Sequence, residues 1–401
     1  MPKSSHPTPS NIPAPILVRS TGEFAEMMAH LRDQPLIAVD TESDSLYRYH
    51  PRVCLIQISA YAHSAETRPS PADPLPTVDY LLDPLHFHRF QPLGELFADP
   101  AVEVLFHAAE NDVRLLDRDF NFRCANVYDT QLAARILGRS GVGLAAMLQA
   151  EFGVVSDKSM QRTDWGRRPL TPQQMTYAQL DTHYLPVLRQ RQIEKLKAAE
   201  RWEEAQEGFA ALAELRYEEP AQERTFWRMK QTRDVPEEDL GLLEELWSWR
   251  EITAERLDRP PFKILGDTVL GEITQRKPTS LEELAQIRGF SDRSVKRFGR
   301  EVLEAVRLGQ QRPTPPFPEP TARPEQLLSN AERARYDSLR QWRTTTANER
   351  GVDPDIVFNN DTLLQIATRQ PATLEALQEI AAIGPWKART YGPAVLAIGN
   401  R

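Results

Sequence analysis

Two acidic residues, Asp40 and Glu42, end a run of apolar residues in the segment LIAVDTE (36–42). Residues i and i+2 of a β-strand point to the same face, so both carboxylates are expected on one side of the strand end. A carboxylate in apolar surroundings is costly unless it is paired or binds a cation. The spacing therefore indicates a divalent-metal site, and the alternative is a strand end that frays into solvent.

Three further residues could complete this site. Asp112 lies early in a helical pattern that follows the apolar segment VEVLFHA (102–108). Tyr177 and Asp181 are four residues apart in a helix that Thr171 is expected to cap, and this spacing places them on one helix face. Each also has a structural explanation, because Asp112 could favour the helix dipole and the other two could form a surface hydrogen bond.

Short apolar strands and helical patterns fill the first half of the chain. Strands are predicted over residues 36–40, 52–60, 78–83, 102–108 and 124–129. The first three lie close together and favour an antiparallel meander, and helices are predicted after the last two, over 110–120 and 130–138. This pattern predicts an α/β domain with a mixed sheet, three antiparallel strands followed by β-α-β-α. A long charged helix is expected over 188–216.

An internal repeat occupies the second half of the chain. The segment that starts at Trp249 resembles the one that starts at Trp342, and the segment from Ser280 matches the one from Thr373, at a shift of 93 residues. Each copy predicts an all-α bundle. The resulting division is a flexible tail (1–15), an α/β domain (16–216), a first helical domain with its connecting segment (217–310), a Pro-rich linker (311–329) and a second helical domain (330–401).

The composition is that of a globular chain, since 40% of its 401 residues are apolar and 26% are charged. Its net charge of −8 argues weakly against a nucleic-acid binder, although local basic patches matter more than the sum. No apolar run reaches the roughly 18 residues that cross a bilayer, so no membrane association is expected. Cys54 and Cys124, each in a predicted strand, are expected to be buried free thiols in a reducing cytoplasm.

The order of the candidate residues resembles the DEDD superfamily of 3′→5′ exonucleases. The motifs of that superfamily are Asp-x-Glu on the first strand, an Asp in the helix after the fourth strand and Tyr-x-x-x-Asp on a late helix. The residues at these places are Asp40, Glu42, Asp112, Tyr177 and Asp181. The tyrosine, where other members have a histidine, is typical of the tyrosine-type branch.

A longer stretch narrows the resemblance. The segment 157–181, DKSMQRTDWGRRPLTPQQMTYAQLD, is similar to the corresponding part of the ribonuclease D family, and FWRMK (226–230) resembles its interdomain segment. The duplicated helical unit resembles the helicase-and-RNase-D C-terminal (HRDC) domain. The resemblance implies a ribonuclease H-like exonuclease domain followed by two HRDC bundles, over nearly the whole chain.

The family resemblance implies a 3′→5′ exoribonuclease that releases 5′-mononucleotides by a two-metal-ion mechanism. The implied cofactors are two divalent ions, Mg²⁺ or Mn²⁺, which suit ligands that are all oxygens. Asp40 would bridge the ions, Glu42 and Asp181 would complete the site of the ion that activates water, Asp112 would act at the leaving-group ion, and Tyr177 would orient the water.

The implied substrate is RNA with an accessible 3′ end, tRNA precursors among them, and no stable protein partner is implied. A DNA exonuclease of repair is one alternative, weakened because the chain has no helicase P-loop motif. A non-catalytic RNA-binding scaffold is the other, and the complete acidic set argues against it.

Several further residues are candidates for nucleic-acid contacts. Leu46 and Tyr47 could stack on the terminal base or pack within their loop. His107 is either a structural histidine or a substrate contact, and Asp129 is expected to cap a helix.

Two basic stretches fit phosphate contacts, with a packed loop and a solvated helix face as the alternatives. They comprise Lys158, Arg162, Trp165, Arg167 and Arg168, and then Arg288, Arg293, Lys296, Arg297 and Arg300. The second repeat keeps only Lys387 and Arg389 at the equivalent place, so the first repeat is expected to bind nucleic acid more strongly.

Overall fold

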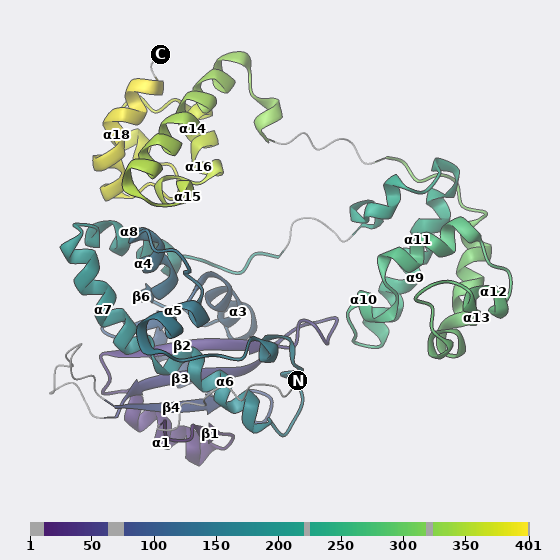
Figure 1. Cartoon of the computed structure of the whole chain (residues 1–401), viewed down its shortest axis with the longest axis horizontal. Coiled ribbons are helices and arrows are strands. Elements are labelled where there is room, and N and C mark those ends of the chain that lie inside the picture. The colour runs from purple at the N-terminus through teal and green to yellow at the C-terminus, as the bar shows by residue number, and fades with distance from the viewer. Residues whose placement is uncertain (1–11, 63–75, 220–224, 318–323, 400–401) are drawn as a thin grey trace. The chain divides into compact units, whose positions relative to one another are not determined.

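The computed structural model describes residues 12–62, 76–219, 225–317 and 324–399 (Figure 1). The chain forms two compact units. One comprises Met1–Ser43, Val53–Tyr217 and Ala322–Arg401, and the other comprises Asp44–Arg52 and Glu218–Thr321. Most of the predicted N-terminal tail and residues 318–323 of the predicted linker lie outside the described residues.

A six-stranded mixed sheet forms the centre of the first unit. Its strands are β1 (Ile16–Val18), β2 (Leu36–Ser43), β3 (Val53–Tyr61), β4 (Thr77–Leu82), β5 (Glu103–Phe106) and β6 (Val127–Asp129), in the order β1-β4-β3-β2-β5-β6. The predicted antiparallel meander is confirmed as β2, β3 and β4, and β5 and β6 add in parallel. Strand β1, too short to show a sequence pattern, pairs in parallel with β4.

Helices cover the sheet, and two of them follow β5 and β6 as expected. The helices are α1 (Thr21–Leu31), α2 (Gln91–Phe97), α3 (Glu110–Phe120), α4 (Thr130–Ile136), α5 (Leu144–Phe152), the 3-10 helix Lys158–Arg162, α6 (Pro172–His183), α7 (Leu185–Ala198) and α8 (Trp202–Ala213). The single helix predicted over 188–216 is wrong. The chain turns at Glu200, whose φ of 56° is left-handed, and continues as two helices.

Helix α6 carries two of the candidate residues and packs on β3 and β4, as Figure 1 shows. Thr171 caps it as predicted, in a capping box with Gln174. A carboxylate of β4, Asp79, lies beneath the helix and is 5% exposed. Its oxygens lie 2.6 Å from the Gln179 amide and 2.8 Å from the His183 ring, and the Ser59 hydroxyl of β3 donates to it at 2.6 Å.

This buried polar network determines how α6 sits along the sheet, because a buried carboxylate needs its donors in place. The register of α6 in turn sets the position of Tyr177 and Asp181.

Both cysteines are buried and unpaired, as expected. Cys54 lies in β3, whereas Cys124 lies in the loop before β6 and not in a strand.

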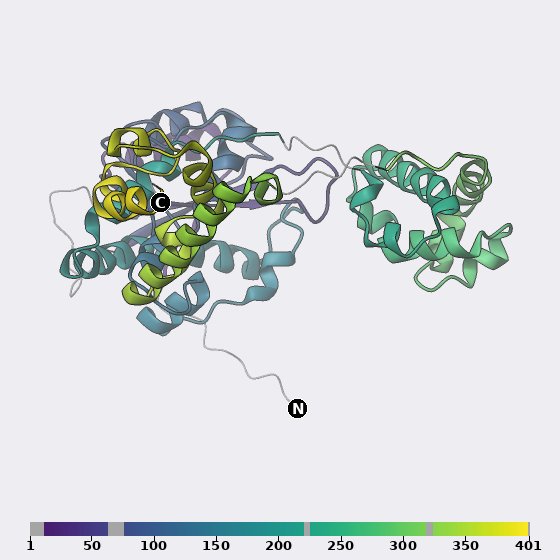
Figure 2. The same ribbon diagram turned by 90° about the horizontal axis from the view of Figure 1, so that it is seen from above.

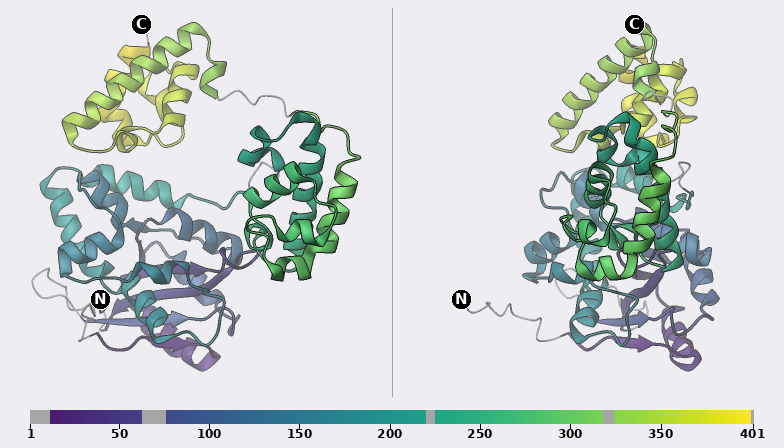
Figure 3. Two further views of the ribbon diagram at one scale, coloured as in Figure 1. Left: turned by 45° about the vertical axis from the view of Figure 1, so that its right-hand side comes forward. Right: turned by 90° about the vertical axis from the view of Figure 1, so that its right-hand side faces the viewer.

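The first repeat belongs to the second unit, and its helices form a bundle (Figure 3, green). The bounds are α9 (Leu240–Arg256), α10 (Pro261–Ile264), α11 (Asp267–Arg276), α12 (Leu281–Ala285) and α13 (Asp292–Gly309), preceded by three short 3-10 helices at Phe226–Arg228, Lys230–Arg233 and Glu237–Asp239. Arg250 is 5% exposed and donates to the Leu265 carbonyl and to Asp267.

The second repeat belongs to the first unit and forms the bundle drawn in light green to yellow in Figure 2. After the 3-10 helix Pro324–Leu327, its helices are α14 (Asn330–Arg350), α15 (Pro354–Val357), α16 (Asn360–Arg369), α17 (Leu374–Gln378) and α18 (Pro385–Gly399).

The internal repeat predicted from the sequence is confirmed in detail. From α10 onward each helix of the first repeat starts 93 residues before its counterpart. Arg343 repeats the role of Arg250, because it is buried and donates to the Phe358 carbonyl and to Asn360.

The second repeat packs on α8, and Ile356 of α15 is buried in the same apolar cluster as Phe209 of α8. None of the helices in the described part of the chain is long and apolar enough to cross a membrane.

Replacing Asp79 by Ala should loosen α6. The donors of Ser59, Gln179 and His183 would lose their acceptor while buried, so the free energy of unfolding is expected to fall by roughly 2–4 kcal/mol. Denaturant titration measures this fall. Asp33→Ala, at an exposed position, is the control and should stay within about 0.5 kcal/mol of the wild type. Equal stability of the two variants would contradict the assigned role of Asp79.

Candidate active site

Three acidic side chains from β2 and α6 meet at the edge of the sheet. One carboxylate oxygen from each of Asp40, Glu42 and Asp181 lies within 4.8 Å of the others. They line a cavity of about 610 Å³, together with Asp112 and Tyr177. The fold therefore brings the five residues predicted from the sequence to one place.

Asp112 is held by the residue that stands between the two acids of β2. The Thr41 backbone N–H and hydroxyl both donate to one Asp112 oxygen, at 3.0 and 2.5 Å. Helix α3, which carries Asp112, follows β5 after the short loop 107–109, in which Ala108 has a left-handed φ of 64°. The carboxylate is 6% exposed. The loop between β5 and α3 thus directs Asp112 toward the cavity.

Burial and nearby like charge raise the free energy of the charged forms of these four carboxylates. Burial raises the pKa of Asp40 well above its usual range, and repulsion from Asp112, Asp181 and Glu42 adds to the shift. Burial also raises the pKa of Glu42 to about 9, and that of Asp181 well above its usual range. Burial raises the pKa of Asp112 to about 7, although its hydrogen bonds from Thr41 lower it.

This donor set fits a divalent cation. All four side chains offer hard oxygen ligands, and neither Cys nor His joins the three clustered acids in the described structure. A cation would replace mutual repulsion by attraction and return the carboxylates to their charged forms.

Tyr177 forms part of the wall of the cavity and is 9% exposed. Its ring lies 6.1 Å from that of Trp165, measured between centroids. Burial raises the pKa of its hydroxyl, and the charges of Asp181, Glu42 and Asp40 raise it further. The hydroxyl therefore stays protonated and can donate a hydrogen bond.

His107 also lines the cavity, and its Nδ1 lies 3.0 Å from the Thr130 hydroxyl. Burial lowers its pKa to about 4, so the ring is neutral at physiological pH. This position is compatible with both roles considered from the sequence, and substrate contact stays a prediction. Asp129 is confirmed as the cap of α4, because its side chain accepts from the N–H groups of Gln131 and Leu132.

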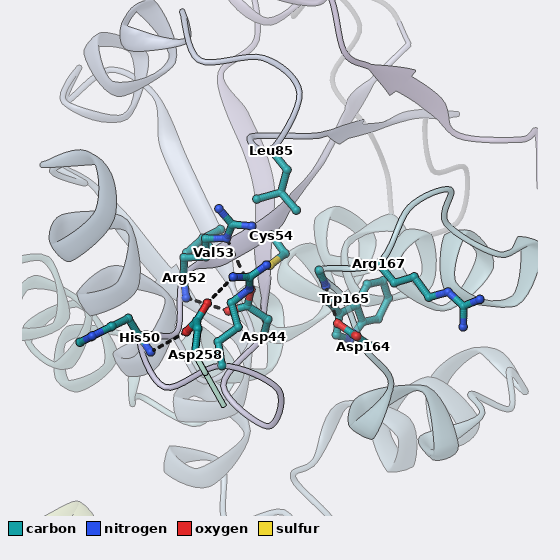
Figure 4. Close-up of polar contacts among 12 residues, drawn as sticks. Asp44, His50, Arg52, Val53, Cys54, Leu85, Asp164, Trp165, Arg167 and Asp258 are labelled. Atoms are coloured by element: carbon teal, nitrogen blue, oxygen red, sulfur yellow. Dashed lines mark hydrogen bonds and ion pairs between the residues drawn. The ribbon is translucent and has the colours of Figure 1, made fainter. Parts of the chain in front are cut away.

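The basic stretch before α6 divides into exposed and buried members. Lys158, Arg162 and Arg167 are exposed, and Lys158 lines the cavity. Trp165 is 1% exposed and packs under its loop, whereas Arg167 extends away from it (Figure 4). Trp165 therefore belongs to the packed loop considered from the sequence and offers no exposed ring face to a base.

Arg168 holds this loop on the sheet. Its guanidinium contacts both Asp83 oxygens, at 2.5 and 2.9 Å, and donates to the carbonyl oxygens of Trp165 and Cys54. With its hydrogen bonds used in this way, Arg168 has a structural role and not the predicted phosphate contact.

Leu46 and Tyr47 belong to the second compact unit, in the segment Asp44–Arg52. Leu46 is exposed, and the Tyr47 ring lies under the Lys263 ammonium, 3.4 Å from the ring centroid. One face of the Tyr47 ring is therefore in contact with Lys263 of the same unit.

The segment that carries these two residues is held by buried and charged groups, as Figure 4 shows. Asp44, fully buried, accepts from the Arg52 N–H at 2.9 Å. Asp258 accepts from the backbone N–H groups of Tyr49 and His50, at 3.1 and 3.4 Å.

The basic patch of the first repeat is on the surface of its bundle. Its five members are all exposed, one in the hairpin before α13 and four on that helix: Arg288, Arg293, Lys296, Arg297 and Arg300. Their placement is compatible with phosphate binding, which stays a prediction.

Three polar residues of the sheet that lie at or beneath the site were not predicted from the sequence. Thr41 orients Asp112, Asp79 positions α6, and Gln57 lies opposite Asp40 in the β2–β3 ladder. Neither amide atom of Gln57 has a hydrogen-bond partner among the described residues. A polar residue inside an otherwise apolar strand is the signal that could have found Asp79 and Gln57.

Known proteins share this fold and domain order. A family model described as 3'-5' exonuclease matches residues 15–197, and the HRDC domain model matches residues 239–306 and 332–398. Ribonuclease D of Granulibacter bethesdensis is 28% identical over 403 residues, which cover 98% of this chain and 94% of that protein. Ribonuclease D of Escherichia coli is 28% identical over 307 residues, covering 76% and 77%.

Solved structures agree in fold. The crystal structure of Escherichia coli RNase D matches with a TM-score of 0.61 at 23% identity, over 96% of this chain and 98% of that one. A protein from Bifidobacterium adolescentis matches with a TM-score of 0.75 at 19% identity, over 97% of both chains.

A mixed-sheet exonuclease domain with an acidic cavity, followed by two HRDC bundles, defines a 3′→5′ exonuclease. Within that class, the chain is similar over most of its length to bacterial ribonucleases D.

A rise in pH should destabilise the metal-free chain, and added Mg²⁺ should stabilise it. The pKa of Glu42 is about 9 in the folded metal-free chain, against an ordinary value of 4.5, so the folded state retains a proton that the unfolded state releases. The free energy of unfolding in EDTA is therefore expected to fall between about pH 5 and pH 9, by on the order of 1 kcal/mol or more. Added Mg²⁺ should reverse the fall, because it binds the deprotonated carboxylates.

Denaturant titrations at both ends of this pH range, with EDTA or Mg²⁺, measure the effect. Asp40→Asn should flatten the pH dependence and abolish the response to Mg²⁺, whereas Asp33→Asn, at an exposed position, should change neither. A wild-type protein equally stable in EDTA and in Mg²⁺ at the alkaline end would contradict a metal site at these residues.

Proposed function

We propose that the chain is a metal-dependent 3′→5′ exoribonuclease that releases 5′-mononucleotides one at a time. The observation that carries this proposal is the convergence of Asp40, Glu42, Asp112, Tyr177 and Asp181 on one cavity. The similarity to bacterial ribonucleases D over most of the chain supports it. As its cellular role we propose cytoplasmic trimming of structured RNAs with accessible 3′ ends, tRNA precursors among them.

The proposed cofactors are two divalent ions, Mg²⁺ or Mn²⁺. Asp40, Glu42 and Asp181 would hold one of them, and Asp112 would hold the other together with Asp40. When bound, such ions supply Lewis-acid stabilisation of the attacking and leaving oxygens of the phosphodiester. The raised pKa values of these carboxylates support this assignment, since burial and mutual repulsion disfavour their charged forms and a bound cation would offset both effects.

Tyr177 is proposed to orient the attacking water. It stands one helical turn from Asp181, and its hydroxyl keeps its proton because burial and the neighbouring acids raise its pKa. A protonated phenol acts by donating or accepting a hydrogen bond and not as a general base.

The terminal nucleotide is proposed to occupy the acidic cavity, whose volume of about 610 Å³ is within the usual range of small-ligand sites. Lys158 is exposed on its wall and could contact the phosphate backbone. The neutral His107 is a further candidate contact on the same wall.

The decisive experiment compares RNA and DNA of one sequence, labelled at the 5′ end and carrying either a free or a blocked 3′ hydroxyl. The proposal predicts stepwise shortening of the unblocked RNA in Mg²⁺ and none in EDTA or with Asp40→Asn. Preferential shortening of DNA would identify a DNA exonuclease, and binding without shortening would identify a scaffold. Unchanged trimming by Asp40→Asn would refute the assigned site.

Tyr177→Phe should lower kcat by about 10²-fold, the usual effect of removing one positioned hydrogen-bond donor. The concentration of Mg²⁺ needed for half-maximal activity should not change, because the four carboxylates remain. Tyr184→Phe is the matched control, since it removes the same atom from a ring that stacks on Phe152. A Tyr177→Phe enzyme with wild-type kcat would contradict the role in orienting water.

Replacing Arg293, Lys296 and Arg297 by Ala should weaken RNA binding by roughly tenfold or more and reduce the slope of log K against log salt by about 2–3. The value of kcat at saturating RNA should remain, because none of the three residues is among the five proposed to carry the chemistry. Fluorescence anisotropy in EDTA measures the binding.

The control for this change is a second set of three exposed cations in the same repeat, Arg256, Arg276 and Arg307, each ion-paired with a glutamate. An equal loss of affinity in both variants would show that net charge, and not this patch, determines binding.

A further inference from the structure

Helix α8 binds the second repeat through an acidic face at its N-terminal half. Glu204 pairs with Arg350, with 2.9 Å between Oε1 and Nη1, and Glu203 pairs with Arg389. The Glu204 side chain is only 2% exposed and that of Arg350 is 19% exposed, so this pair is held away from water. The two acids therefore neutralise two arginines of the second repeat.

A third acid of α8, Glu207, lies at the N-terminus of α18. Its carboxylate accepts from the backbone N–H groups of Trp386 at 2.6 Å and Lys387 at 3.2 Å. N–H groups in the first turn of a helix have no partner within the helix and bind anions. A Cβ at Gly384, directly before the helix, would collide with this carboxylate. The second repeat thus provides an anion site, and α8 fills it.

The first repeat has the same corner without such an acid. Ser291, which stands 93 residues before Gly384, caps α13 with its own hydroxyl and accepts from the Ser294 N–H at 3.2 Å. The turn before the helix repeats one unusual backbone angle, since Gly289 and Ala382, which are 93 residues apart, have left-handed φ angles of 89° and 69°. Around this corner the first repeat exposes its basic patch.

The cations at this corner of the second repeat interact with acids of α8 instead. Lys387 is partly buried; burial lowers its pKa, and the charges of Glu207 and Glu204 raise it. Arg389 and Arg350 are paired with acids of the same helix. Backbone N–H groups, a lysine and two arginines in one place are the groups that bind phosphate. Here the N–H groups and the arginines meet carboxylates of α8, and the Lys387 ammonium lies within the field of Glu207 and Glu204.

We propose that α8 is an internal competitor of RNA, whose carboxylates occupy the phosphate-binding corner of the second repeat, so that this repeat anchors the exonuclease domain while the first repeat binds the substrate. The inference rests on the RNA substrate proposed above. Carboxylate and phosphate bind arginine and helix N-termini alike. Because α8 belongs to the same chain, its effective concentration at this corner is high, and RNA displaces it poorly.

The test uses the full chain with Glu203 and Glu207 both replaced by Gln. Exchange of the Trp386 and Lys387 amide hydrogens should become faster, because their acceptor is weakened. Affinity for a hairpin RNA with a single-stranded 3′ end, measured by anisotropy in EDTA, should rise about threefold or more, with a salt slope steeper by about 1–2. The control, Glu26→Gln with Glu194→Gln, removes the same charge from exposed positions and should change neither measurement.

A second pair of substitutions completes a cycle. Lys387→Gln with Arg389→Gln should leave RNA affinity unchanged in the wild-type background, where these cations are occupied, and should cancel the gain in the Glu203→Gln, Glu207→Gln background. A gain that survives this change would overturn the proposal, since the affinity would then come from elsewhere.

Two other outcomes would also overturn it. Faster amide exchange with unchanged RNA affinity would show that α8 is an anchor which masks no RNA site. Unchanged exchange would show that the carboxylates do not hold the corner. Failure of the proposed function is distinguishable from both, because the wild-type chain would then fail to trim the unblocked RNA in Mg²⁺, whatever its affinity for RNA.

Discussion

Repulsion among four clustered carboxylates is the constraint on which the rest of the structure depends. Burial raises the pKa of Asp40, Glu42, Asp112 and Asp181, and repulsion from Asp112 adds to the shift of the other three. Such an arrangement is unfavourable without a cation, so the surrounding fold has to hold it in place. The same repulsion that destabilises the cluster without a cation favours the binding of divalent ions.

The elements that carry the acids are rigid ones. Asp40 and Glu42 lie on a strand with neighbours on both sides, and α6 is clamped to the sheet by Asp79. Thr41 then ties Asp112 to the same strand. Ligands on strands and helices keep their positions better than ligands on loops, which phosphodiester chemistry requires, because the reacting atoms must be aligned.

The two helical repeats show how one backbone can serve two purposes. Both bury an arginine that donates to the same carbonyl position and to a side chain at the start of the third helix. Their surfaces have diverged at the hairpin before the last helix. Exposed cations surround this corner in the first repeat, and glutamates of α8 cover it in the second.

The sequence by itself predicted the five side chains that the fold brings to one cavity, the antiparallel meander and the helical duplication. These features are local or periodic: Asp40 and Glu42 share a strand face, Tyr177 and Asp181 share a helix face, and the repeat is visible as self-similarity. The break at Glu200 and the short strand β1 could not be predicted, because tertiary contacts and not local pattern produce them.

Only the tertiary structure decided which polar residues support the site and which of the predicted nucleic-acid contacts are used in packing instead. Trp165 and Arg168 belong to a basic, aromatic stretch typical of nucleic-acid binding, yet packing buries the ring and Asp83 occupies the guanidinium. Asp79 and Glu207 act on groups distant in the chain, on α6 and on the start of α18. A side chain's partner depends on which segments the fold brings together, and residue type and spacing do not contain that information.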